Sequence, residues 1–481
     1  MENVTECKII PIPKHYSSLS GEIVSKMRII TKNIEWEKLC DAFCESMNKV
    51  MGIEMAHGKG GIEIEFDEKV VKEGYEIIIN DKVLIKASDI HGAAYALSSI
   101  MQLAKLKEGR LCFNKCVITD KPDKDYRGLM IDLARKWHPF SSLLKYVDIC
   151  WFYKIKYLHL HFIDDQGYTL PSKAFPKLSE LSRCYSFEEI ERLCKYAKAR
   201  GVELIPEIEM PGHIKILNMA YPEIFADCSE EGQERSIITE SGVTMDASSV
   251  ICPGSEKAFA GIKSLIDEVC EMFDCRYIHL GGDEVNTKAW ESCSVCKEYM
   301  KNNNISDVEE LYCDFTGRIT DYALSKGVTP IIWEGFKRKY SKMISKDVIV
   351  IGWECHYQNP DELFEDGYKI INCSWQPLYV VPSLIQRWGI REILSWNVYE
   401  WQHWWEKSAA TLNPIHLPES DRVLGGQLCV WEQTFEREVG FAAENIAALS
   451  ERVWAVKRIR TFEEFSDAYI IQSDKLFKLI S

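Results

Sequence analysis

The chain has 481 residues, of which 46% are hydrophobic, and its formal net charge is −15 at pH 7. This length and composition suffice for a large buried core and argue against a disordered chain. The acidic excess disfavours a nucleic-acid partner, because a polyanion would be repelled, and a neutral substrate fits better.

The N-terminal segment MENVTECKII lacks the basic start and apolar stretch of a signal peptide. We find no run of 18 apolar residues, so we expect no transmembrane helix and no membrane partner. Eighteen cysteines without an export signal are better explained as reduced thiols than as a disulfide framework. The sequence therefore predicts a cytoplasmic protein and leaves its oligomeric state open.

A small α+β domain is predicted over residues 1–120. Apolar residues at 75–87 surround an Asn-Asp turn, a pattern typical of a β-hairpin, and residues 91–105 have apolar side chains at helical spacing. The polar, proline-containing stretch 119–125 then predicts a linker.

Eight short apolar segments follow the linker and alternate with helical or loop stretches, which favours a (β/α)8 TIM barrel over residues 121–455. The competing fold is an open doubly wound sheet, but the chain lacks its Gly-x-Gly-x-x-Gly turn and a P-loop. Residues 456–481 are predicted to form a helical tail packed on the barrel. The expected strands are Arg127–Ala134, Tyr157–Asp165, Glu203–Met210, Tyr277–Val285, Thr329–Gly335, Val348–Cys355, Lys369–Trp375 and Val423–Glu432.

Two adjacent acidic residues, Asp283 and Glu284, end the fourth expected strand after two glycines. Active sites of TIM barrels lie at the carboxyl ends of the strands, so both carboxyl groups are candidates for catalysis. Because side chains alternate along a strand, the pair needs a local bend to serve one pocket. An Asp-Glu dipeptide on its own is more often a solvent-exposed pair without a catalytic role.

Other strand ends supply further carboxylates, a histidine, an arginine and tryptophans. Aromatic faces stack on sugar rings and charged groups hold hydroxyls, so their convergence on one mouth predicts a sugar pocket. Any single tryptophan is more often core filling, but recurrence at successive strand ends weakens that interpretation. These candidates are Arg127, Asp164, His213, Trp333, Trp353, Trp375, Tyr379 and Trp431.

At this point the chain resembles glycoside hydrolase family 20, the β-N-acetylhexosaminidases, over nearly its whole length. Residues 73–104 also resemble the small α/β domain that precedes the barrel in this family. The motifs that carry the resemblance are RGLMIDLARKWHP (127–139), HFIDDQ (161–166), PEIEMPGH (206–213), HLGGDE (279–284) and ALSERVW (448–454).

The resemblance implies an exo-acting retaining hydrolase that removes terminal β-linked GlcNAc or GalNAc from a carbohydrate, with the 2-acetamido oxygen of the substrate as nucleophile. Glu284 would be the general acid and base, and Asp283 would orient the acetamido group. Asp164 and His213 would support the acid. The implied substrate-binding residues are Arg127 for the outer hydroxyls, Tyr379 for the acetamido oxygen, Trp333, Trp353 and Trp431 for the pocket wall, and Gln433.

Two positions depart from the family pattern and put the choice between gluco and galacto sugars in doubt. Val381 stands where many members have an aspartate, and Trp431-Glu432-Gln433 stands where they have Trp-Gly-Glu. Gln433 would bind the sugar hydroxyls as a neutral group in place of the missing glutamate, or Glu432 would bind them from a position shifted by one residue.

No cofactor or metal is predicted. The pair Cys293 and Cys296 has zinc-ligand spacing, but no second ligand pair stands at a suitable distance, and we interpret it as a helix turn after the catalytic loop. The tryptophan-rich segment 395–405 forms either a wall of the aglycone subsite or a loop packed on the barrel.

Two alternative functions stay open. One is a catalytically silent amino-sugar-binding protein on the same barrel, although intact acidic residues argue against it. The other is a hydrolase with a protein nucleophile.

Overall fold

The computed structural model describes residues 7–225, 236–238, 244–246, 250–382, 388–458 and 460–481. Residues 1–6 of the segment inspected for a signal peptide lie outside these ranges. Within them, none of the helices combines the length and the apolar character needed to cross a membrane.

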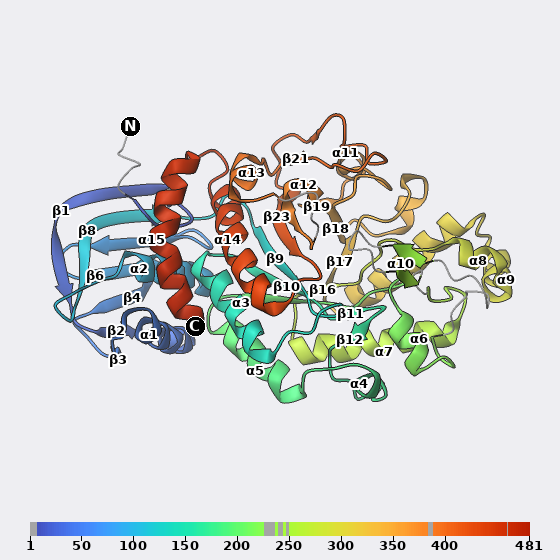
Figure 1. Ribbon diagram of the computed structural model, residues 1–481, viewed down its shortest axis with the longest axis horizontal. Helices are drawn as coiled ribbons and strands as arrows, with labels where there is room; N and C mark the ends of the chain where they lie inside the picture. Colours follow the sequence, from blue (N-terminus) through green and yellow to red (C-terminus); the bar gives the residue numbers. More distant parts are fainter. Residues whose placement is uncertain (1–6, 226–235, 239–243, 247–249, 383–387, 459) are drawn as a thin grey trace.

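The residues before the linker form a mixed β-sheet with two helices, on the left of Figure 1. The predicted hairpin is present, because β5 and β6 pair antiparallel with Ile77 opposite Ile85. The strand order is β1-β8-β5-β6-β4-β2-β3, with β7 beside β8. The elements are β1 (His15–Ser25), β2 (Arg28–Thr31), α1 (Glu37–Met51), β3 (Ala56–His57), β4 (Ile62–Phe66), β5 (Tyr75–Ile79), β6 (Val83–Ala87), α2 (Ile90–Leu103), β7 (Lys105–Lys107) and β8 (Arg110–Asp120).

Eight parallel strands form a closed barrel in the centre of the molecule, which confirms the predicted fold. The last strand closes it by pairing with both the first and the seventh. The barrel strands are β9 (Tyr126–Asp132), β10 (Tyr157–His161), β13 (Glu203–Glu207), β16 (Tyr277–His279), β17 (Thr329–Trp333), β18 (Ile349–Gly352), β19 (Lys369–Asn372) and β23 (Val423–Val430).

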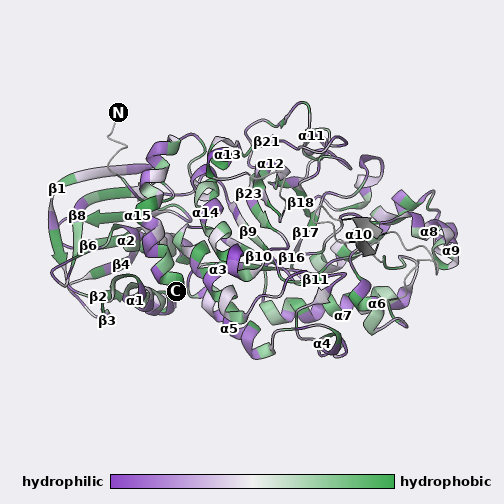
Figure 2. Cartoon of the chain, in the orientation of Figure 1, coloured by the Kyte–Doolittle hydropathy of each residue, from purple (hydrophilic) through white to green (hydrophobic). Residues whose placement is uncertain are grey.

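Alternation along the strands separates the barrel interior from the layer under the helices. In β18, Ile349 and Ile351 belong to a central cluster with Trp333, whereas Val350 packs in the larger outer core. Most side chains on both faces of the strands are buried, so the strand sequences are rich in apolar residues, and Figure 2 shows much green in the barrel.

Helices surround the barrel, and a 3-10 helix, η3 (Arg338–Met343), follows the fifth strand in place of an α-helix. Helices of this layer include α3 (Phe140–Phe152), α5 (Phe187–Lys198), α7 (Glu256–Phe273), α10 (Val308–Ser325), α11 (Pro360–Glu365) and α14 (Phe435–Trp454).

The C-terminal helix α15 (Phe462–Ile480) packs on α3 of the barrel and also on α1 of the N-terminal domain. Its Gln472 donates to the carbonyl of Lys8 at 2.9 Å, and Lys475 donates to the carbonyl of Ala104 at 2.9 Å. The tail therefore joins the two domains. The predicted boundaries at 120 and 455 stay predictions.

The predicted barrel strands run past the observed ends, because the chain leaves the sheet early and enters the loops that build the mouth. The fourth strand ends at His279 instead of Val285, since Gly281, Gly282 and Glu284 all have positive φ angles. The residues with chemical interest thus lie on loops held by short strands.

Candidate active site

The loop after β16 brings Asp283 and Glu284 to the same mouth. Gly281 has φ +66° and Gly282 φ +108°, and a Cβ atom at Gly281 would overlap the Glu209 carboxylate, so glycine is required there. Glu284 itself is left-handed with φ +48°. This is the bend that the strand alternation demands, and backbone strain of this kind is typical of functional sites.

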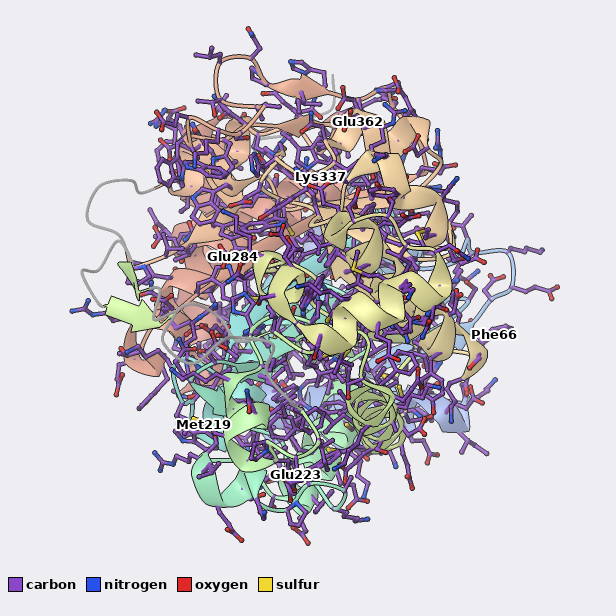
Figure 3. All side chains as sticks on the ribbon, turned by 90° about the vertical axis from the view of Figure 1, so that its right-hand side faces the viewer. Phe66, Met219, Glu223, Glu284, Lys337 and Glu362 are labelled. Atoms are coloured by element: carbon purple, nitrogen blue, oxygen red, sulfur yellow. The ribbon has the colours of Figure 1, made fainter. Side chains whose placement is uncertain are left out.

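The two carboxyl groups differ in exposure. The Asp283 side chain is 13% exposed, whereas that of Glu284 is 50% exposed. Figure 3, which faces the right-hand side of Figure 1, shows Glu284 on the face that carries the mouth. Asp283 is thus largely shielded from solvent, and Glu284 lies at the solvent-exposed rim of the mouth.

His213 lies between this pair and a buried aspartate. Its Nε2 atom is 3.5 Å from a Glu284 carboxylate oxygen and 3.9 Å from one of Asp283, and its Nδ1 atom is 3.4 Å from Asp164. Asp164 in turn forms a 2.7 Å ion pair with Arg135 and a 3.1 Å contact with His161. The predicted supporting pair is therefore adjacent to the predicted catalytic pair.

The charges of these groups set their protonation. Burial lowers the pKa of His213, but Asp164, Asp283 and Glu284 outweigh it and raise that pKa to about 10. Burial raises the pKa of Asp164, yet Arg135 and His213 together hold it well below the ordinary value. The result at neutral pH is a histidinium next to an aspartate anion.

Asp283 behaves differently. Burial raises the pKa of its carboxyl, His213 lowers it, and Glu284 raises it again, with a net pKa of about 6. A buried carboxyl whose pKa lies near the working pH is a common feature of active sites.

A second layer of polar groups lies under the pair and was not among the predicted site residues. Glu207 at the end of β13 accepts from Trp333 Nε1 at 2.7 Å and contacts His161 and His279, each at 2.6 Å. Glu209 is buried beside it, and burial together with Asp283 and Glu207 raises its pKa well above normal. Glu209 is thus a neutral acid. The two glutamates that alternate in Pro-Glu-Ile-Glu, at the end of a predicted strand, were the sequence pattern that could have indicated these residues.

The predicted aromatic residues, Trp375 included, form one continuous group at the mouth. Trp353 and Trp375 each stack on Tyr379, with ring centroids 6.1 and 4.3 Å apart. Trp333 lies 6.1 Å from both Trp353 and Trp431. Such a set of faces provides the walls of a sugar pocket.

The structure contradicts the prediction for Arg127. This residue stands at the start of β9, at the opposite end of the barrel from the mouth, and its side chain is completely buried. It donates to Glu73 of the N-terminal domain at 3.0 Å and to Tyr95 at 2.5 Å. Arg127 therefore joins the domains and cannot reach a sugar hydroxyl.

Arg135, three residues beyond the end of β9, lies at the mouth instead. Its guanidinium is 5.0 Å from the centre of the Trp431 ring, and its Nε atom is 4.0 Å from Glu432. The Glu432 side chain is 30% exposed, whereas Gln433 is only 6% exposed. Of the two residues considered for hydroxyl recognition, Glu432 is the one with the more accessible polar group.

A buried carboxylate organises the loop after β18. Glu334 accepts from the backbone amides of Cys355, His356 and Tyr357 at 3.0, 2.7 and 3.1 Å. The loop carries Glu354, whose pKa is raised to about 9 by burial first and then by Glu284. Sequence reasoning missed both residues, because only the folded loop brings them towards the catalytic pair.

The two halves of the tryptophan-rich segment 395–405 differ: the first packs on the barrel, and the second lies towards the mouth. Trp401 is buried and donates to the carbonyl of Gly352 at 3.0 Å, and Trp396 is also in the core. Trp404 packs edge-on against Trp375, 6.2 Å between ring centroids, and its Nε1 atom has no hydrogen-bond partner among the described residues. Only the second half of the segment therefore reaches the mouth.

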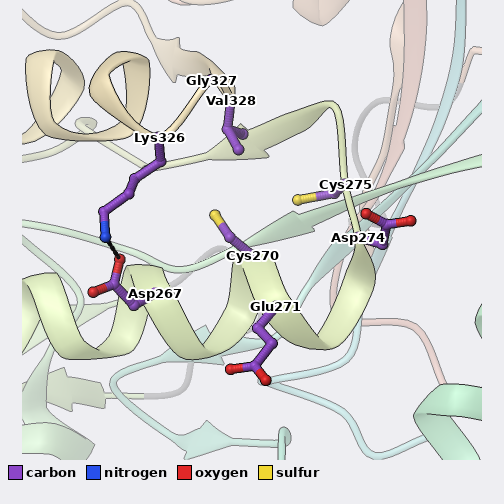
Figure 4. Close-up of a pocket in the computed structure, with 8 residues that line it drawn as sticks. All are labelled: Asp267, Cys270, Glu271, Asp274, Cys275, Lys326, Gly327 and Val328. Atoms are coloured by element: carbon purple, nitrogen blue, oxygen red, sulfur yellow. Dashed lines mark ion pairs between the residues drawn. The ribbon is translucent and has the colours of Figure 1, made fainter.

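A separate solvent-facing hollow lies between the C-terminal end of α7 and the start of β17 (Figure 4). It is lined by Cys270 and Cys275 and by an ion pair of 2.8 Å between Lys326 and Asp267. These residues precede the barrel strands, so the hollow lies at the end away from the mouth and does not belong to the site.

The model of the glycosyl hydrolase family 20 catalytic domain matches residues 125–457, and the model of domain 2 of the same family matches residues 6–121.

Curated relatives agree with these matches. A β-hexosaminidase of Akkermansia muciniphila is 34% identical over 257 residues, which is 50% of this chain and 51% of that protein, so the match spans about half of each. The β-hexosaminidase subunit beta of Entamoeba histolytica is 28% identical over 83% of this chain and 70% of its own length.

Solved structures share the fold. A β-N-acetylhexosaminidase from Bacteroides fragilis superposes with a TM-score of 0.79 at 23% identity, covering 97% of this chain and 94% of its own. An exo-β-N-acetylglucosaminidase from Vibrio harveyi, solved with N-acetylglucosamine, gives a TM-score of 0.83 at 20% identity over 99% and 78% of the two chains. Since family models cover both domains, the chain belongs to glycosyl hydrolase family 20, a family of β-N-acetylhexosaminidases.

Proposed function

We propose that this protein removes terminal, non-reducing β-linked N-acetylhexosamine from glycans with retention of configuration, through an oxazolinium intermediate. The observation that carries the proposal is the joint placement of Asp283 and Glu284 beside His213, with one polar atom of each within 4.8 Å of the others. Neighbouring carboxyls on one loop suit two different tasks at one anomeric centre, protonation of the leaving group and orientation of the acetamido group. They suit less well an acid and a protein nucleophile, which stand about 5–5.5 Å apart across the anomeric centre.

Glu284 would protonate the glycosidic oxygen and later remove a proton from the attacking water. Its exposed position at the rim is where the leaving group departs. The His213 imidazolium, 3.5 Å away, would favour the anionic form that remains after proton transfer and would hold the carboxyl in place.

Asp283 would accept a hydrogen bond from the acetamido N–H, which turns the acetamido oxygen towards the anomeric carbon. As a carboxylate it would also stabilise the positive charge that develops on the oxazolinium ring, and its small exposure makes this interaction stronger than it would be in water. The Tyr379 hydroxyl would donate to the acetamido oxygen. Trp333, Trp353 and Trp431 would enclose the acetyl methyl and the sugar face.

Hydroxyl recognition at the far side of the ring would fall to Arg135 and Glu432. Both lie at the mouth, and the 4.0 Å spacing between them allows one hydroxyl to be shared between a donor and an acceptor. Arg127 has no part in this, and buried Gln433 would have at most a supporting one. No cofactor or metal enters the proposed reaction.

The direct test is turnover of p-nitrophenyl β-GlcNAc and β-GalNAc, with the anomer of the first product followed by NMR. We expect release of the β-anomer and strong inhibition by a thiazoline that imitates the oxazoline. Appearance of the α-anomer first would exclude retention.

Two further measurements separate the alternatives. Binding of GlcNAc without turnover, unchanged in Glu284→Gln, would identify a silent binding protein. If azide restored turnover of Asp283→Ala and a glycosyl azide were formed, azide would be replacing an enzyme carboxylate, and the enzyme would use a protein nucleophile. A cytoplasmic location remains a prediction, and fractionation of the native cells would test it.

A further inference from the structure

Three cysteines from two distant parts of the chain meet beside the catalytic loop. Cys252 lies 3.5 Å from Cys296 and 3.7 Å from Cys293, measured between sulfur atoms, and all three sulfurs lie within 4.8 Å of one another. Cys252 and Cys296 are buried, and Cys293 is half-buried. The sequence shows the Cys-x-x-Cys pair but not the third thiol, which stands 41 residues before Cys293.

These spacings suit a shared metal ion. Two thiolates bound to one tetrahedral zinc at about 2.3 Å are about 3.8 Å apart, close to the observed separations. A disulfide needs sulfurs about 2.05 Å apart, which none of these pairs has. The ion's fourth position would be taken by water.

The cluster lies where two catalytic loops meet. The Ile251 amide donates to the carbonyl of Pro211 at 2.8 Å, two residues before His213. The Trp290 indole of α8 (Lys288–Ser292) donates to the carbonyl of Ile251 at 2.9 Å. Helices α8 and α9 (Ser294–Asn303) directly follow the loop of Asp283 and Glu284, at the right-hand end of Figure 1.

We propose that Cys252, Cys293 and Cys296 bind a zinc ion that fixes the segment after β13 to the helices after β16. Each thiol releases its proton to solvent on binding, so the ion is held as a thiolate complex. The ion has no part in bond cleavage. It holds together the loops that carry His213 on one side and the catalytic pair on the other.

The experiment is metal analysis of the purified full-length protein. We expect about one zinc per chain, because structural thiolate sites bind zinc tightly enough to survive purification. In the single variants Cys252→Ser, Cys293→Ser and Cys296→Ser the zinc content should fall about tenfold or more, since even substitutions outside the ligand set cost about 10- to 100-fold in affinity.

The matched control is Cys270→Ser with Cys275→Ser, a thiol pair at the other end of the barrel (Figure 4). This variant should keep its zinc. If the control lost zinc as well, or if the three cluster variants kept it, the assignment would be wrong.

A second measurement needs no variant and so does not depend on their folding. Chelation of the native protein should release the zinc, lower the melting temperature and expose three more thiols to a colourimetric thiol reagent. Cobalt added in its place should show the thiolate-to-cobalt charge-transfer band. Protein isolated under reducing conditions with no bound zinc, or with a disulfide within the cluster by mass spectrometry, would overturn the proposal.

Discussion

The imidazole of His213 lies 3.5 Å from the Glu284 carboxylate. His213 also contacts Asp164, whose other oxygen is paired with Arg135, so an anion and two cations stand in line behind the general acid. Substitutions along this line therefore have effects that can be told apart by rate, by pH dependence and by stability.

Replacing Glu284 by Gln removes the proton donor while preserving shape. We expect kcat to fall by about 10²–10⁴-fold on substrates with a poor leaving group, with KM nearly unchanged. The loss should be smaller on p-nitrophenyl glycosides, because their leaving group needs little protonation. Steady-state kinetics on both substrate types provide the measurement, and an equal loss on both would argue against an acid role.

The pH dependence should report on Asp283, which has to be ionised to hold the acetamido group. Its pKa of about 6 predicts that kcat/KM falls as the pH drops through this value. His213 lowers the pKa of Asp283, so His213→Ala should raise that pKa and move the acid limb of the profile to higher pH. A limb that stays in place or moves down would contradict this electrostatic link.

The barrel could be predicted because its strands are buried on both faces and therefore appear as apolar blocks. The ends of those strands could not be predicted to the residue. Gly281, Gly282 and Glu284 all have positive φ angles, and a Cβ atom at Gly281 would overlap the Glu209 carboxylate, a close approach made only in the folded protein.

The two arginines near the first barrel strand also have positions that the sequence alone could not predict. Arg127 lies at the start of β9 and Arg135 three residues beyond its end, within one motif, and the motif does not say which of them lies at the mouth. Strand direction decides it, because the carboxyl end of every barrel strand points to the mouth. Burial against the N-terminal domain then gives Arg127 a partner, Glu73, that no local pattern in the sequence connects with it.

Arg127 and Arg135 should therefore respond differently to removal. Arg127→Ala leaves the buried Glu73 with Lys156 as its remaining partner and should cost about 3 kcal/mol of folding free energy, with kinetics of the folded fraction unchanged. Arg135→Ala leaves the buried Asp164 with His161 and His213 as partners, and in the folded protein it should lower kcat/KM by about 10- to 100-fold. Denaturant unfolding together with kinetics tests both variants, and a large KM effect in the Arg127 variant would restore the original prediction.

Glu432 should decide between gluco and galacto sugars. Glu432→Ala should reduce kcat/KM by about 10-fold or more and change the ratio between β-GlcNAc and β-GalNAc substrates, since it removes a charged acceptor at the mouth. Gln433→Ala is the matched control and should leave this ratio as it is. If the ratio followed Gln433 instead, the neutral amide would be the group that reads the hydroxyl.

The tryptophan-rich segment gives a test with its own internal control. Trp404 packs against Trp375 at the mouth, so Trp404→Ala should lower kcat/KM on extended oligosaccharides several-fold more than on a p-nitrophenyl monosaccharide. Trp401 is fully buried, and Trp401→Ala should instead cost about 3–5 kcal/mol of stability with no preference between the substrates. Because both residues stand on one short segment, a general disturbance of the loop would affect all substrates alike in both variants. Loss confined to long substrates in the Trp404 variant alone would assign this residue to the aglycone subsite, and unchanged kinetics would leave it a packing residue.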